Sequence, residues 1–174
     1  MGKRSIRENK NIYFESREEA GLTRAQASEL IGTISESRLE KMETGKTAIY
    51  PEDVLDMSRA YKKPELCNYY CTHECRIGQE SVPEVKLSSL SEIVLGMLSA
   101  LNSLDRQKER LIDITADGEI TEDELPDFVK IQEQLDQIDL TVESLKLWMA
   151  STIAEGKIDK KKIAEATEKY RTKK

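Results

Sequence analysis

The 174-residue sequence has few of the residues on which β-rich folds depend. Its two Phe, six Tyr and one Trp are too few aromatic side chains to fill the core of a sandwich or barrel. Glycine and proline, with 8 and 4 residues, are also scarce, so long stretches run without the residues that end helices. Glu, Lys, Leu, Ile and Ala are frequent instead. The composition therefore predicts an all-α protein.

The sequence also lacks a long apolar run. Its longest, from Ile93 to Leu101, is interrupted by a glycine and a serine and is far shorter than the ~20 residues of a membrane-spanning helix. The basic start of the chain leads into no apolar segment, so we expect no secretory signal. Three cysteines, an odd number within nine residues, do not make a disulfide framework. We expect a cytoplasmic chain without a membrane partner.

Acidic residues outnumber basic residues only slightly. The 27 Lys+Arg and 33 Asp+Glu residues give a net charge of −6, which argues against a generally basic nucleic-acid binder but allows a local positive face. The chain has one histidine, no glycine-rich phosphate loop and no spacing typical of a nucleophile, histidine and acid. We therefore expect no enzymatic activity.

Capping residues mark a series of short helices in the first part of the chain. Thr23, with Gln26 three residues later, forms a capping-box pattern, and Gly32 ends that helix. Each predicted helix is too short to be stable alone in water, so the helices must pack on one another. The predicted ranges are Asn11–Ala20, Thr23–Ile31, Ser35–Thr44 and Pro51–Tyr61.

A glycine follows each of the first two predicted helices. The third helix ends in Met42-Glu43-Thr44-Gly45-Lys46, and the fourth begins at Pro51. With this order and these motifs, residues 11–66 resemble the Xre/Cro-like helix-turn-helix repressors. The resemblance implies a five-helix, lambda-repressor-like fold, in which the second helix braces the third in the major groove of double-stranded DNA. It also implies a transcriptional regulator. The turn Gly32-Thr33-Ile34-Ser35 is one residue longer than is usual in that family, which leaves the register of the reading face open by one position.

The third predicted helix carries most of the candidate DNA contacts. Leu39 and Met42, with Ile34 before them, have core spacing, so their neighbours face outward. Arg38 is the best candidate to read a base, because a guanidinium can bind O6 and N7 of guanine together. Residues at helix and turn ends suit phosphates. The predicted DNA-binding residues are Arg24, Ser35, Glu36, Ser37, Arg38, Lys41, Lys46 and Thr47.

An alternative function follows from the acidic side chains of the same segment. Glu36 and Glu40 repel phosphate, although Glu can also accept a hydrogen bond from N4 of cytosine. The alternative is a helical protein–protein interaction adaptor whose helix-turn-helix is structural.

The second part of the chain has apolar residues at alternating spacings of three and four. This pattern predicts a long, coiled-coil-like α-helical hairpin, with Leu101, Leu104, Ile138 and Val142 in its seam. Further apolar residues widen each stripe and predict a homodimer. The predicted oligomer interface comprises Ile93, Leu98, Leu147 and Trp148. The predicted organisation is a DNA-binding domain (1–80), a linker (81–86), an oligomerisation hairpin (87–155) and a basic tail (156–174).

Two segments have the residue types of metal sites. Cys67, Cys71, His73 and Cys75 provide the ligand set of a structural zinc site, which requires this segment to be a loop, because a helix would spread the cysteines over about 12 Å. Buried, metal-free cysteines are the alternative. The acidic turn 113–124 partly matches a calcium loop. We favour a helix–helix connection there, in which Thr121 caps the second helix with Glu124, and expect no calcium binding.

Overall fold

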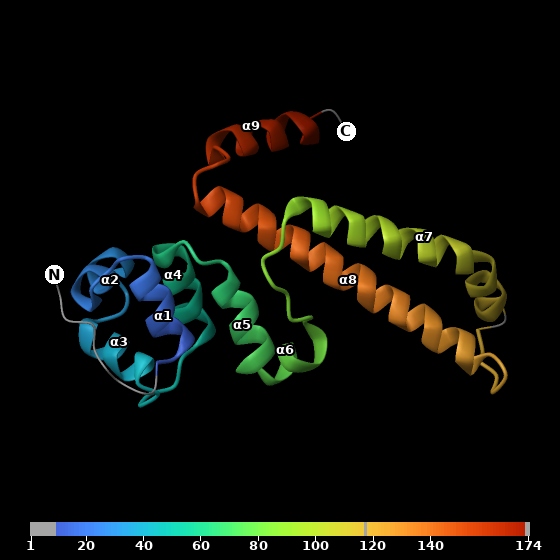
Figure 1. The fold of residues 1–174 in the computed structure, drawn as a ribbon, viewed down its shortest axis with the longest axis horizontal. Helices are drawn as coiled ribbons and strands as arrows, with labels where there is room; N and C mark the ends of the chain where they lie inside the picture. The colour runs from blue at the N-terminus through green and yellow to red at the C-terminus, as the bar shows by residue number, and fades with distance from the viewer. Residues whose placement is uncertain (1–9, 117, 173–174) are drawn as a thin grey trace. The chain divides into compact units, whose positions relative to one another are not determined.

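A computed structural model describes residues 10–116 and 118–172 of the chain (Figure 1). These residues form helices, turns and loops, and none of them lies in a strand, which confirms the prediction of an all-α fold. No helix among them has an apolar stretch that could cross a membrane. The helices are α1 (Ile12–Glu19), α2 (Arg24–Ile31), α3 (Glu36–Glu43), α4 (Pro51–Tyr61), α5 (Glu65–His73), α6 (Arg76–Ser81), α7 (Leu90–Thr115), α8 (Leu125–Ala154) and α9 (Lys160–Arg171).

The chain divides into two compact units. One combines Met1–Val82 with Ala150–Lys174, and the other is Pro83–Met149. The first unit contains α1 to α6, α9 and the last residues of α8, and the second contains α7 and most of α8. The domain borders predicted at residues 80, 86 and 155 stay predictions.

The first five helices share one apolar core. Each contributes residues to it, and Leu39 and Met42 of α3 are fully buried, as predicted from their spacing. Eight- to eleven-residue helices bury little surface each, so their stability depends on this common core. The buried residues are Tyr13, Ala27, Ile34, Leu39, Met42, Val54, Met57, Tyr61 and Leu66.

Local capping sets the ends of α2 and the start of α3. The Thr23 hydroxyl accepts a hydrogen bond from the Gln26 N–H, and the Gln26 side chain accepts one from the Thr23 N–H, which confirms the predicted capping box. Gly32 ends α2 with a φ of 77°, in the left-handed region that favours glycine. The Ser28 hydroxyl then donates to the Ile34 carbonyl at 2.8 Å, so the turn between α2 and α3 is fixed at both ends.

In the second unit, α7 and α8 pack together as a hairpin. Gly96 on α7 faces Thr141 on α8 so closely that a Cβ on Gly96 would lie 3.4 Å from the Thr141 methyl group. Near the other end of α7, Arg110 Nε lies 2.8 Å from Asp127 Oδ2. Ile93 and Ala100 of α7 and Ile131 of α8 are buried. The predicted hairpin is therefore present.

The buried face of this hairpin differs from the predicted one. Leu101, predicted to lie in the seam, is 46% exposed, whereas Ala100 is buried. Ile93 and Leu147, predicted to face a second copy, are only 5% and 7% exposed, so they are not available to a partner. The reason is that α7 carries two adjacent apolar stripes, and the stripe with small residues at Gly96 and Ala100 allows the closer approach of helices.

The other predicted hairpin residues have intermediate or exposed positions. Leu104, Ile138, Val142 and Trp148 are half-buried, and Leu98 is 52% exposed. Leu98 is therefore the residue of the predicted oligomer interface that lies on the outer face of the hairpin.

Candidate nucleic-acid interface

One face of helix α3 packs into the core, and the other is exposed. Leu39, Met42 and Glu43 are buried, whereas Glu36, Ser37, Glu40 and Lys41 are exposed. Ser35 caps the helix, and its hydroxyl accepts a hydrogen bond from the Arg38 N–H at 3.3 Å. The outward face is thus polar, and its position is set by the side chains beneath it.

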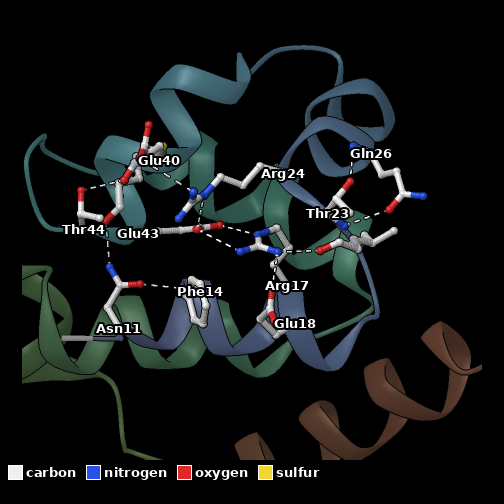
Figure 2. A network of polar contacts seen from close by, with 12 residues as sticks. Asn11, Phe14, Arg17, Glu18, Thr23, Arg24, Gln26, Glu40, Glu43 and Thr44 are labelled. Atoms are coloured by element: carbon white, nitrogen blue, oxygen red, sulfur yellow. Dashed lines mark hydrogen bonds and ion pairs between the residues drawn. The ribbon is translucent and has the colours of Figure 1, made fainter. Parts of the chain in front are cut away.

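A buried ion pair between Arg17 of α1 and Glu43 of α3 fixes this position (Figure 2). The Arg17 Nε and Nη2 atoms donate to the two carboxylate oxygens of Glu43 at 2.5 and 3.1 Å. Arg17 Nη1 also donates to the Leu22 carbonyl at 2.6 Å. Burial alone would lower the pKa of Arg17, but its hydrogen bonds with Glu43 and Glu18 raise it above the usual value. Arg17 therefore stays charged and joins α1, the following turn and α3.

Arg24 is the third member of this network. Its Nε donates to Glu43 Oε2 at 2.8 Å, and its Nη1 lies 3.8 Å from Glu40 Oε1 (Figure 2). The sequence predicts a phosphate contact for Arg24, but the structure gives it partners on α3. It joins the first turn of α2 to the last turn of α3.

Arg38, the predicted base-reading residue, lies in the first turn of α3, and its side chain reaches the start of α4. Its Nη2 is 2.6 Å from Asp53 Oδ2, and its guanidinium carbon is 5.8 Å from the ring centre of Tyr50. Its side chain is 37% exposed. The hydrogen bond with Asp53 raises the pKa of Arg38 above its usual value.

The remaining predicted contacts lie in the last turn of α3 and directly after it. Lys41 and Lys46 are exposed, and neither forms an ion pair with another described residue. The Lys46 N–H donates to the Lys41 carbonyl at 2.7 Å, which closes the end of the helix, and Thr47 is half-buried. These two lysines are therefore available to bind an external anion.

A family model described as a helix-turn-helix domain matches residues 15–72. Residues 15–72 are a helix-turn-helix domain. No curated protein and no solved structure matches the chain significantly. The match begins within α1 and ends within α5, so the helix-turn-helix domain includes α2, α3 and the core beneath them. Helices α6 to α9 lie outside it.

Sequence reasoning missed the acidic partners inside the helix-turn-helix domain. Glu43 follows Leu39 by four residues and therefore lies on the core face of α3. A carboxylate on a core face requires a cation, and this signal could have indicated Arg17, four residues after the buried Tyr13. Asp53, the acidic partner of Arg38, lies in the first turn of α4.

The segment with the possible zinc ligands, at the end of the helix-turn-helix domain, is a helix and not the loop that a zinc site requires. Cys67, Cys71 and His73 lie on helix α5, and Cys75 follows it, so their donor atoms do not converge. No group of three or more His, Cys, Asp or Glu in the described part of the chain is placed to hold a metal ion. Instead, Cys67 Sγ donates to Ser58 Oγ at 3.4 Å, and the His73 ring stacks on Tyr69. Burial raises the pKa of the Cys71 thiol, which disfavours the metal-binding thiolate.

The acidic turn 113–124 contains Asp117, which lies outside the described residues. At its end, the Thr121 N–H donates to Glu124 Oε2 at 3.1 Å, and α8 begins at Leu125. Glu124 thus makes the contact that the predicted cap requires. The absence of calcium binding stays a prediction.

Proposed function

We propose that this protein is a sequence-specific DNA-binding transcriptional regulator that acts as a homodimer. The observation that carries the proposal is the geometry of α3. Its inner face is fixed by Leu39, Met42 and the Arg17–Glu43 ion pair, and its outer face presents polar side chains. A rigidly supported helix with a polar outer face is what major-groove recognition requires.

The outer side chains divide into two proposed roles. Arg38, Ser37 and Glu36 lie in the first turn of α3, the part of a recognition helix that contacts base edges. Arg38 would bind guanine, and Glu36 would accept a hydrogen bond from cytosine. Lys41, Lys46 and Thr47 follow toward the end of the helix and would bind phosphates.

Binding of duplex DNA at graded salt tests the first part of the proposal. Contacts through lysines release counterions, so the affinity should fall steeply as salt rises. Selection from a random duplex pool should then enrich one motif. If the protein fails to bind duplex DNA even at low salt, the proposal is wrong.

The outer face of α7 supports self-association. Leu90, Val94, Leu98 and Leu101 follow a spacing of three and four and are 39–52% exposed. From Leu90 to Leu104 the sole charged residue is Glu92, in a chain of which 34% is charged. Depletion of charge is typical of interface cores. Two copies would also double the DNA contacts of a single helix-turn-helix domain, which reads few base pairs alone.

A second candidate function is a protein–protein adaptor. It is favoured by Glu36 and Glu40 on the outer face of α3 and by the pairing of Arg24 and Arg38 with carboxylates of the same chain. The salt titration also separates these two functions, because an adaptor would show no salt-dependent affinity for duplex DNA.

A further inference from the structure

Two residues at the start of α4, Asp53 and Tyr50, both contact the side chain of Arg38. Asp53 is buried, and its Oδ2 atom accepts two hydrogen bonds, from Arg38 Nη2 at 2.6 Å and from the Tyr50 N–H at 3.0 Å. One oxygen thus joins the start of α4 to the first turn of α3. The Tyr50 side chain is exposed, and its ring lies beside the guanidinium.

These contacts restrict how the guanidinium can turn. A hydrogen bond fixes one of its edges, and the adjacent ring limits rotation about the long, flexible side chain. Asp53 provides its one hydrogen-bond partner among the described side chains, and a guanidinium has five N–H donors, so the outer edge keeps donors for a base. Bidentate binding to guanine needs such a fixed plane, and a side chain already held in position loses less entropy on binding.

We propose that Asp53 and Tyr50 are positioning residues that orient Arg38 for base recognition and thereby set the sequence preference of α3. This inference rests on the proposed DNA-binding function. Lys41 is the comparison within the same helix, because it is exposed without an ion-pair partner in the described part of the chain. Lys41 suits a contact with phosphate, because such a contact needs a positive charge but no fixed orientation of the side chain.

The proposal predicts effects of opposite sign for specific and non-specific DNA. The carboxylate of Asp53 repels phosphates, so its removal should leave binding to a scrambled duplex unchanged or stronger. The same change loosens the hold on Arg38, because a neutral acceptor binds a guanidinium less strongly than a carboxylate does, so binding to the preferred duplex should weaken. A purely structural role for Asp53 would instead weaken both affinities together.

The experiment compares the full-length protein with its Asp53→Asn variant on two duplexes, the motif enriched from a random pool and a scrambled duplex of equal length. Asn can still accept the Tyr50 N–H, so the start of α4 is preserved. The ratio of the two affinities, measured by fluorescence anisotropy at one salt concentration, should fall about tenfold. Tyr50→Ala should also lower it, whereas Tyr50→Phe, which keeps the ring, should not.

The Arg38→Ala background tests whether Asp53 acts through Arg38. In that background Asp53→Asn should change the ratio no further, because the group that it orients is absent. A ratio unchanged by Asp53→Asn, or an effect that adds to that of Arg38→Ala, overturns the positioning role and leaves the proposed function intact. A wild-type protein that binds DNA without any sequence preference overturns both the positioning role and specific regulation.

Discussion

The charged side chains of the helix-turn-helix domain have two environments. Arg17 and Glu43 are 3% and 2% exposed and satisfy each other, whereas Lys41 and Lys46 are exposed. A buried pair fixes the relative positions of its two helices, and removal of one partner leaves the other charge buried without that counterion. Substitutions in the two groups should therefore affect different properties.

Glu43→Gln should destabilise the helix-turn-helix domain by about 3 kcal/mol. The variant leaves the buried Arg17 and the half-buried Arg24 without their shared carboxylate, at the cost expected for a broken buried pair. Urea unfolding followed by circular dichroism measures the change in the free energy of unfolding. Glu40→Gln is the matched control on the same helix, because Glu40 is exposed, and it should shift stability by about 0.5 kcal/mol or less. Equal losses in the two variants would contradict the anchoring role of Glu43.

Lys46→Ala should lower affinity for every duplex sequence to a similar extent. The loss of one phosphate contact should also flatten the slope of affinity against salt by about one. Titrations at several salt concentrations, with preferred and scrambled duplexes, measure both effects. Lys130→Ala, an exposed lysine of the hairpin, serves as the control. An unchanged slope for Lys46→Ala would show that this lysine does not contact phosphate.

Helix ends could be predicted from the sequence because their causes are local. Thr23 and Gln26 are three residues apart, Ser35 caps the residue three positions later, and Pro51 begins its own helix. Each signal depends on neighbours within one helical turn, so periodicity and capping rules suffice.

The polar contacts of the candidate interface could not be predicted in the same way. Arg17 and Glu43 are 26 residues apart, and Arg38 and Asp53 are 15 apart, so only the packed core brings them together. The choice between two apolar stripes on α7 likewise depends on how closely α8 approaches Gly96. The choice between a metal site and packed cysteines at residues 67–75 depended on whether this segment is a loop or a helix, and most of it is a helix.

Gly32→Ala should cost about 1 kcal/mol of stability. Gly32 has a φ of 77°, which alanine adopts only with strain, and a Cβ there would have no atom within 4 Å. The loss is therefore a backbone effect without a clash. Gly78→Ala should cost more, since its Cβ would overlap the carbonyl of Cys71, where α6 packs on α5. Thermal unfolding of both variants tests this order, and a Gly78→Ala variant as stable as the wild type would contradict it.

For the whole molecule, we expect the outer face of α7 to determine the oligomeric state. The wild-type mass in solution should be near twice 19.8 kDa. The Leu98→Glu variant should have the mass of a monomer, because a carboxylate is costly to bury in an apolar interface. Multi-angle light scattering measures this, with helix content checked by circular dichroism. Leu95→Glu is the matched control, since Leu95 is 67% exposed on α7 but lies outside the 90–94–98–101 stripe. A monomeric wild type, or equal dissociation by both variants, would contradict the proposed interface.

The side chains of the eight-residue helix α3 form two groups, one buried and one exposed. Leu39, Met42 and Glu43 hold it in place, whereas Glu36, Ser37 and Lys41 have no part in the core. Under the proposed function, mutation of the outer residues would therefore change the DNA sequence preference while the fold keeps its stability. If the proposed function holds, α3 would be a suitable place to engineer a new DNA sequence preference, with the inner residues left unchanged.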